Sequence, residues 1–583
     1  MVFAGQQTSL HAQTQFPANI YPDTSNFPFL HGVASFDPTS ESVLLWTRTD
    51  PGLLQPPTIS GTWELAEDSL FTNILQSDTF QTGFSSDYTV AVNVTGLQPA
   101  TTYWYRFRVQ DSLLSPTGRT RTAPDGPTDE VTFAVGSCSS VYSGFFNAYR
   151  SIGNRNDLDL VVHLGDYIYD FVDEDEEVRV PDPYPTNPQG LEGWRERHKY
   201  YLLDPDLRWA RQRHPFTVIW DNHDVEADND SLNPRPSVQA FQEYVPMRLP
   251  DTTQPEIIYR RLQYGNLVDL LMLDILLYRD AQSVPEPDRS MLGAQQRSWL
   301  EQELLNSQAT WRVVGSQNLF AGWTLPNVVG LGGDALDDSN WDGYPAERRA
   351  LMQYLADNAI GNNIVLSGDA HISFAMDLAI DPNDEALYNP TTGEGAVGVE
   401  FLPTSFSRGN LDEALGSDFL ADIVAGASQL ANPHHRYSEF ISHGYGTLTI
   451  TPDSAVARFH YLPILEQSVQ EEIGQELVVL NGDNHWRRQG SVNRSERLIT
   501  DNELRAYPNP TTGKLRLEGA ALNNLQELPE LDVLDMNGRK IARLPAQFSG
   551  NAIQTNLGGR SSGLYILRAR FATGVFYQKI RVE

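Results

Sequence analysis

The chain has 583 residues, and 75 acidic against 42 basic side chains give it a formal net charge of −33. A chain of this length divides into about three domains, and a 40% hydrophobic content supplies each with a core, which excludes disorder for most of the chain. A protein with this much negative charge repels nucleic-acid backbones and anionic lipid. We therefore expect neither nucleic-acid scaffold binding nor peripheral membrane binding. The single cysteine, Cys138, excludes an intrachain disulfide, and we expect no transmembrane segment.

The first predicted domain covers residues 22–124. From Phe29 to Arg121, short stretches alternate apolar and polar residues, as in Tyr103-Trp104-Tyr105-Arg106-Phe107, with turn residues between them. This alternation is typical of an antiparallel β-sandwich. Because Leu97 to Tyr105 resembles a strand corner of fibronectin type III domains, we expect a fibronectin-like β-sandwich.

The second predicted domain covers residues 129–490, after a linker rich in Pro, Gly and Asp. Short apolar runs alternate here with helical patterns, and this alternation indicates a layered α/β domain. A β-rich stretch follows, with a hairpin expected across Tyr445 to Tyr461. The expected strands are Val131 to Val135, Leu158 to Leu164, Phe216 to Trp220, Leu267 to Leu273, Trp311 to Gly315 and Ile364 to Ser367, and the clearest helices are Gly293 to Ser307 and Pro345 to Ala359.

The third predicted domain, residues 505–583, has a different composition. It contains three of the four lysines of the chain, and 11 basic against 6 acidic residues give it a net charge of +5. The preceding 504 residues therefore carry −38. Short alternating segments such as Lys514 to Glu518 and Phe576 to Val582 predict a small β-sandwich.

Reactive side chains follow four of the predicted strands of the α/β domain. They occur in Gly136-Ser137-Cys138, in Gly165-Asp166-Tyr167-Ile168-Tyr169-Asp170, in Asp221-Asn222-His223-Asp224 and in Gly368-Asp369-Ala370-His371. Functional groups of layered α/β domains gather at the carboxyl ends of strands, so we expect these side chains to lie together.

The residue types in these four motifs fit a dinuclear metal centre. The Asp166 carboxylate can bridge two cations, while the Tyr169 phenolate and the Cys138 thiolate suit a trivalent ion such as iron. The Asn222 amide suits a harder divalent ion, and His371 offers a nitrogen ligand. Two such cations generate hydroxide at neutral pH and hold both oxygens of an in-line displacement, which is the chemistry of phosphoester hydrolysis.

The combination Gly-Asp-x-x-Tyr, Asn-His-Asp and Gly-Asp-x-His resembles the metallophosphoesterase signature, and its details are similar to the PhoD-like alkaline phosphatase D family. The resemblance extends over most of residues 29–490 and includes His31 to Ser35, Leu292 to Leu300 and Trp341 to Arg348. It implies a four-layer α/β/β/α metallophosphoesterase core between the two β-sandwiches.

The resemblance also implies roles for individual residues. Fe³⁺ and Ca²⁺ are the implied metals. The implied ligands are Cys138, Asp166, Tyr169, Asn222, Asp369 and His371, with Asp166 as the bridge. Asp166 and His223 are the implied catalytic residues, since His223 would contact the phosphate and protonate the leaving oxygen.

Three departures from the family pattern leave alternatives open. Many members carry Asp-Asp-His where this chain has Asp221-Asn222-His223, so either Asp221 or Asn222 binds the second ion. Asp274-Ile275-Leu276 replaces an expected Asp-Thr-Arg, and Asp274 is either a ligand or a loop cap. Gln317 stands where related enzymes can offer a histidine.

Three other polar residues lie outside these motifs. Arg408 either binds phosphate or pairs with a carboxylate. We expect His434 and His435 at the surface.

The C-terminal segment resembles a type IX secretion sorting domain in Ala506 to Gly513, Asp535 to Arg539 and Gly563 to Tyr565. The resemblance implies recognition by the secretion machinery and a secreted or cell-surface location. In addition, Leu10 to Gln13 resembles the end of a signal-peptide cleavage site.

The sequence therefore supports one main hypothesis and two alternatives. The main hypothesis is a secreted, metal-dependent alkaline phosphatase or phosphodiesterase, in which a metal-bound hydroxide directly attacks a small phosphoester. The first alternative is a phospholipase-type phosphodiesterase. The second is a surface binding protein on a catalytically altered fold, an idea motivated by Leu276 and Gln317.

Overall fold

The computed structural model describes residues 20–582, apart from residues 111, 173–176, 227–234, 325–338, 489–503, 523–527, 535–539, 550–551, 558 and 572–573. The motifs Leu10 to Gln13 and Asp535 to Arg539 therefore lie outside the described residues. Within the part of the chain that is described, no helix combines the length and the apolar character needed to cross a membrane.

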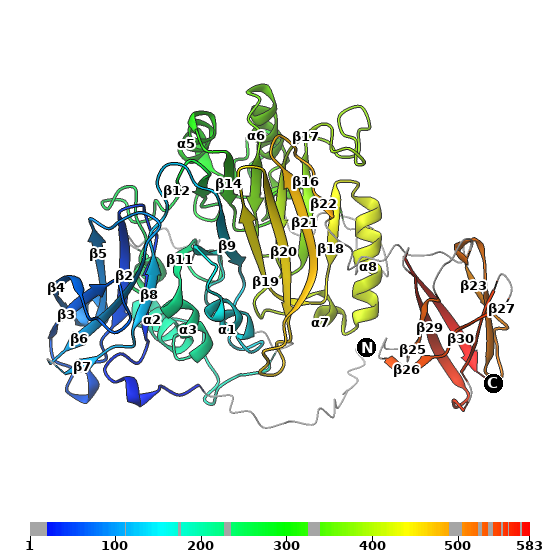
Figure 1. Cartoon of the computed structure of the whole chain (residues 1–583), viewed down its shortest axis with the longest axis horizontal. Helices are drawn as coiled ribbons and strands as arrows, with labels where there is room; N and C mark the ends of the chain where they lie inside the picture. The colour runs from blue at the N-terminus through cyan, green and yellow to red at the C-terminus, as the bar shows by residue number, and fades with distance from the viewer. Residues whose placement is uncertain are drawn as a thin grey trace.

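Two large β-sheets pack face to face at the centre of the molecule (Figure 1). Aromatic side chains join them: Phe133 meets Tyr264 at 5.1 Å between ring centroids, and Phe401 meets Phe459 at 4.9 Å. The first sheet has the order β22-β21-β20-β19-β9-β10-β11-β1-β2-β5, and the second has the order β12-β13-β14-β15-β17-β16-β18. Strands β9, β10 and β11 run parallel, as do β13, β14, β15 and β17.

The strands of the first sheet that belong to the predicted α/β domain are β9 (Val131–Gly136), β10 (Leu160–His163), β11 (Pro215–Val218), β19 (His443–Ile450), β20 (Ser454–Leu462), β21 (Glu472–Leu480) and β22 (Arg487–Arg488). Those of the second sheet are β12 (Arg260–Tyr264), β13 (Val268–Met272), β14 (Trp311–Gly315), β15 (Asn363–Leu366), β16 (Ser373–Ala379), β17 (Ala396–Leu402) and β18 (His435–Glu439). The expected hairpin is confirmed, because Tyr445 of β19 pairs with His460 of β20.

Helices cover the outer face of each sheet. On the first sheet, α1 (Asn147–Asn154) contacts β19, α3 (Pro205–Arg213) contacts β1, and α4 (Pro236–Tyr244) contacts β5 and α2 (Gly190–Tyr201). On the second, α5 (Gly293–Asn306) and α6 (Pro345–Asp357) pack apolar side chains such as Leu300 and Leu351 into one core with Val314 and Val365 of the strands. The remaining helices are α7 (Leu411–Leu415) and α8 (Asp418–Ala431), the latter lying against β18. The predicted four-layer α/β/β/α core is confirmed.

The N-terminal β-sandwich shares one of its sheets with this core. Its separate sheet consists of β3 (Thr58–Ala66), β4 (Ile74–Gly83), β6 (Thr102–Val109), β7 (Leu113–Leu114) and β8 (Gly118–Arg121). Its other strands, β1 (Val33–Phe36), β2 (Ser42–Arg48) and β5 (Thr89–Thr95), extend the first central sheet, because β1 pairs in parallel with β11. The Tyr103 hydroxyl accepts a 2.9 Å hydrogen bond from the Gln98 backbone amide, which fixes this corner of the sandwich.

The C-terminal domain is a small β-sandwich, seen at the right of Figure 1. One sheet contains β23 (Arg505–Tyr507), β24 (Lys514–Glu518), β28 (Ala552–Asn556) and β27 (Gln547–Ser549). The other contains β26 (Lys540–Leu544), β25 (Glu530–Leu534), β29 (Gly563–Phe571) and β30 (Gly574–Val582). Leu517, Val533, Leu567 and Phe576 form the core between them.

A buried ion pair joins the N-terminal strands to both central sheets. Asp37, which follows β1, accepts hydrogen bonds of 2.8 and 2.9 Å from Nε and Nη2 of Arg260 in β12. It also accepts a 2.7 Å hydrogen bond from the Thr217 hydroxyl of β11. Asp37 is 1% exposed and Arg260 is 5% exposed, so each charge depends on the other.

We therefore expect Asp37→Ala to leave the Arg260 guanidinium buried without its carboxylate, at a cost of about 3–5 kcal/mol. The midpoint of thermal unfolding, followed by circular dichroism, should fall by about 3–5 °C, because a cooperative unit of this size has a large entropy of unfolding. Asp157→Ala is the control, since it removes an exposed carboxylate paired with Arg155 and should leave the midpoint nearly unchanged. Equal midpoints for the two variants would show that the Asp37 pair does not hold the sheets together.

Candidate metal centre

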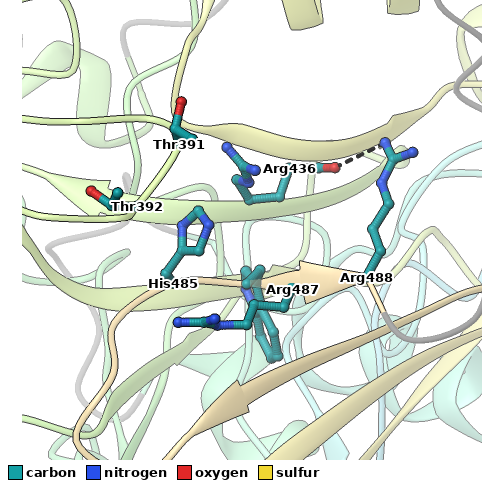
Figure 2. A pocket seen from close by; sticks show the side chains of 7 residues that line it. Thr391, Thr392, Arg436, His485, Arg487 and Arg488 are labelled. Carbon is teal, nitrogen blue, oxygen red and sulfur yellow. Dashed lines mark hydrogen bonds between the residues drawn. The ribbon is translucent and has the colours of Figure 1, made fainter.

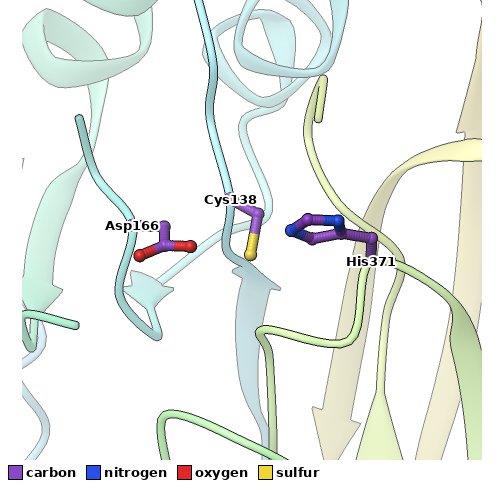
Figure 3. A group of neighbouring side chains, drawn as sticks. All are labelled: Cys138, Asp166 and His371. Carbon is purple, nitrogen blue, oxygen red and sulfur yellow. The ribbon is translucent and has the colours of Figure 1, made fainter. Parts of the chain in front are cut away.

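Three of the predicted ligands meet at the carboxyl ends of three strands. Cys138 follows β9, Asp166 follows β10 and His371 follows β15. The Cys138 sulfur, a carboxylate oxygen of Asp166 and a ring nitrogen of His371 all lie within 4.8 Å of one another. Figure 3 shows the three side chains pointing toward one another from three separate loops. The expectation that strand ends bring these residues together is confirmed for this group.

Backbone hydrogen bonds hold these loops against one another. The Cys138 amide donates to the carbonyl of Gly165 at 3.2 Å, which fastens the loop after β9 to the loop after β10. The Thr404 hydroxyl donates to the carbonyl of His371 at 2.7 Å. The sheet and the hydrogen bonds between its strand-end loops therefore fix the positions of the three side chains.

The backbone is strained at four of the predicted ligands. The φ angles are 58° at Cys138, 52° at Asp166, 66° at Asp369 and 61° at His371. A residue with a Cβ atom pays roughly 1–2 kcal/mol in this left-handed region, so the surrounding hydrogen bonds must hold it there. Four such residues at one point indicate that the loops are shaped to aim side chains at a shared ligand.

Tyr169 completes this group. Its hydroxyl donates a 3.0 Å hydrogen bond to Oδ2 of Asp166 and lies 3.4 Å from Nε2 of His371. The guanidinium of Arg408 lies over the Tyr169 ring, 5.5 Å from its centroid, and Arg408 is itself buried. The structure thus places the predicted phenolate ligand beside the predicted bridging carboxylate.

Asp221 and Asp369 lie next to the same group, whereas Asn222 lies at its edge. Burial raises the pKa of Asp221 well above its usual range, and the nearby carboxylates of Asp369 and Asp166 raise it further. Asn222 is exposed, and its backbone amide donates a 2.9 Å hydrogen bond to Oδ1 of Asp221. Of the two residues that the sequence could not separate, Asp221 is the one buried among the other carboxylates.

The chemistry of these donors fits a bound cation. Burial, followed by the charges of Asp166 and Asp369, raises the pKa of the Cys138 thiol well above its usual range. Burial and the charges of Asp166 and Cys138 likewise raise the pKa of Tyr169. A cation among these groups reverses the effect, because it favours the thiolate and the phenolate. Burial also lowers the pKa of His371 to about 3, which keeps its imidazole in the neutral form that binds metals.

His223 faces the group from the loop after β11. Its Nδ1 lies 2.8 Å from Oδ1 of Asp170, and its ring stacks on Tyr169 with centroids 4.3 Å apart. Burial lowers the pKa of His223, but Asp166 and the hydrogen bond with Asp170 outweigh it, so the pKa is raised overall. Asp170 had no predicted role; its place directly after Tyr169, in the same strand-end loop, was the signal available in the sequence.

Asp274 and Gln317 hold strand ends together. Asp274 accepts hydrogen bonds from the backbone amides of Leu276 and Leu277 at 2.9 and 3.0 Å, and from Nε1 of Trp220 at 3.2 Å. Gln317 accepts from the Ile275 amide at 3.2 Å and donates to the Trp220 carbonyl at 3.1 Å. Their polar atoms are therefore used within the loops, and Asp274 acts as the loop cap that the sequence left open.

The prediction that His434 and His435 lie at the surface is wrong. They are 2% and 3% exposed. Nε2 of His434 lies 2.8 Å from the Gly322 carbonyl, and the His435 ring packs on Phe374 with centroids 4.7 Å apart. The reason is that His434, which precedes β18, lies against the loop at Gly322, while His435 lies within β18, which pairs with β16 and contacts α8.

A cavity of about 400 Å³ opens beside the group. Asp369 and His371 form one side of it, and most of the remaining wall is apolar. The apolar residues are Leu319, Trp323, Ala370, Ile372, Leu411 and Ala414, with Asn340, Gly409 and Asn410 completing the lining.

Three protein-family models match the chain. PhoD-like phosphatase matches residues 133–459, and the PhoD-like phosphatase N-terminal domain matches residues 14–124. The secretion system C-terminal sorting domain matches residues 505–583, which indicates a secreted or cell-surface protein.

Two individual proteins are similar over most of the chain. Alkaline phosphatase D of Bacillus subtilis (strain 168) is 32% identical over 490 residues, which cover 78% of this chain and 80% of that protein. A solved structure of PhoD is 31% identical, with a TM-score of 0.70 over 81% of this chain and 94% of that one. These similarities identify an enzyme that hydrolyses phosphoric ester bonds and whose family implies bound metal ions. The chain belongs to the PhoD-like phosphatase family.

Proposed function

We propose that this chain is a secreted, metal-dependent phosphatase and phosphodiesterase that acts on small phosphoesters. The observation that carries the proposal is the convergence of Cys138, Asp166 and His371 within 4.8 Å, with Tyr169 hydrogen-bonded to Asp166. Thiolate, phenolate, imidazole and carboxylate donors at one buried point suit transition-metal binding. The sorting domain supports export, and we infer that type IX secretion machinery recognises it.

Fe³⁺ is the ion that we assign to Cys138, Tyr169 and His371, with Asp166 shared between two sites. We assign Ca²⁺ to the second site, with Asp166, Asp369 and Asp221 as its carboxylate ligands. When bound, the two ions would supply a hydroxide nucleophile and neutralise charge that develops on the phosphoryl group. The burial of Asp221 beside Asp166 and Asp369 favours it over Asn222 as the second-site ligand.

His223 is the residue that we assign to the leaving group. Asp170 holds Nδ1 of the ring, so Nε2 is the nitrogen that can give a proton to the departing oxygen. The ring is also fixed by stacking on Tyr169. Asp170 would therefore act as a positioning residue for the general acid.

Arg408 is the cation that we assign to the phosphoryl oxygens. It is buried, it lies over the ring of Tyr169, and its positive charge acts on both Tyr169 and His371. A guanidinium matches the geometry of phosphate oxygens better than an ammonium does. Of the two roles left open by the sequence, phosphate binding agrees better with this position.

The apolar cavity favours one alternative substrate class. Trp323, Ile372 and Leu411 would contact the alcohol portion of a phosphoester whose phosphoryl group lies near His371. Such a wall suits aromatic or aliphatic leaving groups, and it is the specific feature in favour of a phospholipase-type phosphodiesterase. The binding-protein alternative is overturned by the relationship to phosphoric ester hydrolases, and Gln317, which motivated it, has a structural role.

We expect His223→Gln to lower kcat by about 100- to 10,000-fold with an alkyl phosphate, since an alkoxide needs a proton to leave. The loss should be much smaller with p-nitrophenyl phosphate, whose leaving group departs without one. Steady-state rates of wild type and variant on both substrates, and on bis-p-nitrophenyl phosphate, test this. Asp170→Asn is the companion variant, and it should show the same substrate dependence at a smaller magnitude.

Equal losses on both monoesters would remove His223 from the role of general acid. If metal-loaded wild-type protein hydrolysed neither the monoesters nor the diester, the proposed function itself would be wrong. Metal content and thermal midpoint, measured on each variant, exclude unfolding as the cause of a lost rate.

A second expectation separates Asp221 from Asn222. Asp221→Asn should raise the calcium concentration needed for half-maximal activity by about 10- to 100-fold, because it removes a negative ligand from the second site. Its iron content, measured by elemental analysis, should stay at the wild-type level. Asn222→Ala should leave calcium activation unchanged. The reverse pattern would identify Asn222 as the ligand and would contradict the assignment made from burial.

A further inference from the structure

A polar cavity, separate from the apolar one beside the metal centre, lies at one lateral edge of the two central sheets. It has a volume of about 430 Å³ and lies where β18 of one sheet and β22 of the other approach each other. Its lining residues come from the β16–β17 loop, from β18 and from the segment around β22. They are Thr391, Thr392, Arg436, His485, Trp486, Arg487 and Arg488 (Figure 2).

The topology separates this cavity from the metal centre. β17 runs parallel to β15, whose carboxyl end leads to Asp369 and His371. Thr391 and Thr392 precede β17, so they lie at the amino end of the same parallel strands. The two sites therefore occupy opposite ends of the second sheet.

The cavity gathers positive charge on a strongly acidic protein. It brings together three arginines, although the chain as a whole carries a net charge of −33. Two carboxylates accompany them: Asp483 accepts a 3.0 Å hydrogen bond from Nε of Arg487, and Asp377 lies 2.6 Å from Nδ1 of His485. Burial, together with the charge of Arg436, lowers the pKa of Arg488, so these cations repel one another.

Several donors in the cavity are fixed in place. Asp377 is fully buried and accepts hydrogen bonds from the Tyr388 hydroxyl at 2.7 Å and the Trp486 backbone amide at 3.0 Å. It also holds Nδ1 of His485, so Nε2 points away from it. Arg488 donates a 3.3 Å hydrogen bond to the carbonyl of Arg436, which couples the two edge strands.

Figure 2 shows how these groups are arranged. The guanidinium of Arg436 and the ring of His485 lie on one side of the cavity, next to Thr391 and Thr392, and the guanidinium of Arg488 lies on the far side of Arg436. Guanidinium groups carry only donors. A cation would be repelled here, whereas a tetrahedral oxyanion would receive several charge-assisted hydrogen bonds.

We propose that this cavity is a second anion site, which binds a phosphate or sulfate group between the Arg436 guanidinium and the His485 ring, with Arg488 adding positive charge at the far side of the cavity. The shared chemistry is a tetrahedral dianion. It can arrive as a free ion or as a substituent on a larger polymer, since the cavity is wider than one such ion. This proposal does not depend on the function assigned to the metal centre.

Equilibrium dialysis of the metal-loaded, full-length protein against radiolabelled inorganic phosphate tests it. The double variant Arg436→Gln/Arg488→Gln should bind one phosphate fewer per chain than wild type. Its kcat and KM on p-nitrophenyl phosphate should be unchanged. The control Arg297→Gln/Arg543→Gln removes the same charge from two ion pairs elsewhere, and it should keep the wild-type stoichiometry.

Competition distinguishes the two sources of the group. Displacement of that phosphate by sodium sulfate, but not by dextran sulfate, would identify a free ion. The concentration of sulfate groups needed for displacement is compared between dextran sulfate and sodium sulfate. If dextran sulfate displaces the phosphate at a tenfold lower concentration of sulfate groups, the natural ligand is a polymer. If the cavity variant and wild type bind equal amounts of phosphate, or if the control loses a phosphate as well, the proposal is overturned.

Discussion

The crowding of acidic donors at the carboxyl ends of β9, β10, β11 and β15 is the constraint on which the catalytic half of this molecule depends. A thiol, a phenol and three carboxylates lie close together here: Cys138, Tyr169, Asp166 and Asp221 are buried, and Asp369 is half-buried at the cavity wall. Burial and the neighbouring acidic groups raise the pKa values of Cys138, Tyr169 and Asp221, so these three groups resist ionisation when no cation is bound. Bound cations remove this conflict, and the same cations are what the hydrolysis of phosphoesters requires.

The surrounding fold keeps these donors in place without contributing to the chemistry. Left-handed backbone at four of the predicted ligands is held by hydrogen bonds between neighbouring loops. Asp274 and Gln317 tie the ends of β11, β13 and β14 to one another. Asp224 accepts hydrogen bonds from the backbone amides of Tyr167, Ile168 and Asp221, which joins the loops that carry Asp166 and His223. Buried polar residues of the supporting loops thus set the geometry of the proposed ligands.

Much of this arrangement could be predicted from the sequence, because it depends on local pattern. Short apolar runs predicted β9, β10, β11, β13, β14 and β15, and polar residues directly after them predicted where Cys138, Asp166 and His371 would meet. The shared sheet could not be predicted in this way, since the pairing of β1 with β11 joins residues 180 positions apart. Burial of His434 and His435 depends on the distant loop at Gly322 and on the pairing of β18 with β16, which no local pattern encodes. Asp221 and Asn222 are adjacent in sequence, and only the folded loop shows which of them is buried.

The two ends of the second sheet carry opposite chemistry, with acidic metal donors at one end and a basic cavity at the other. The central claim concerns the acidic end, where a thiolate and a phenolate are assigned to one iron ion. X-ray absorption spectroscopy at the iron edge, on purified wild type and Cys138→Ser, tests it most directly. The account predicts iron with one sulfur neighbour in the wild type and loss of that neighbour in the variant. Active wild-type protein without iron, or with iron that has no sulfur neighbour, would contradict it.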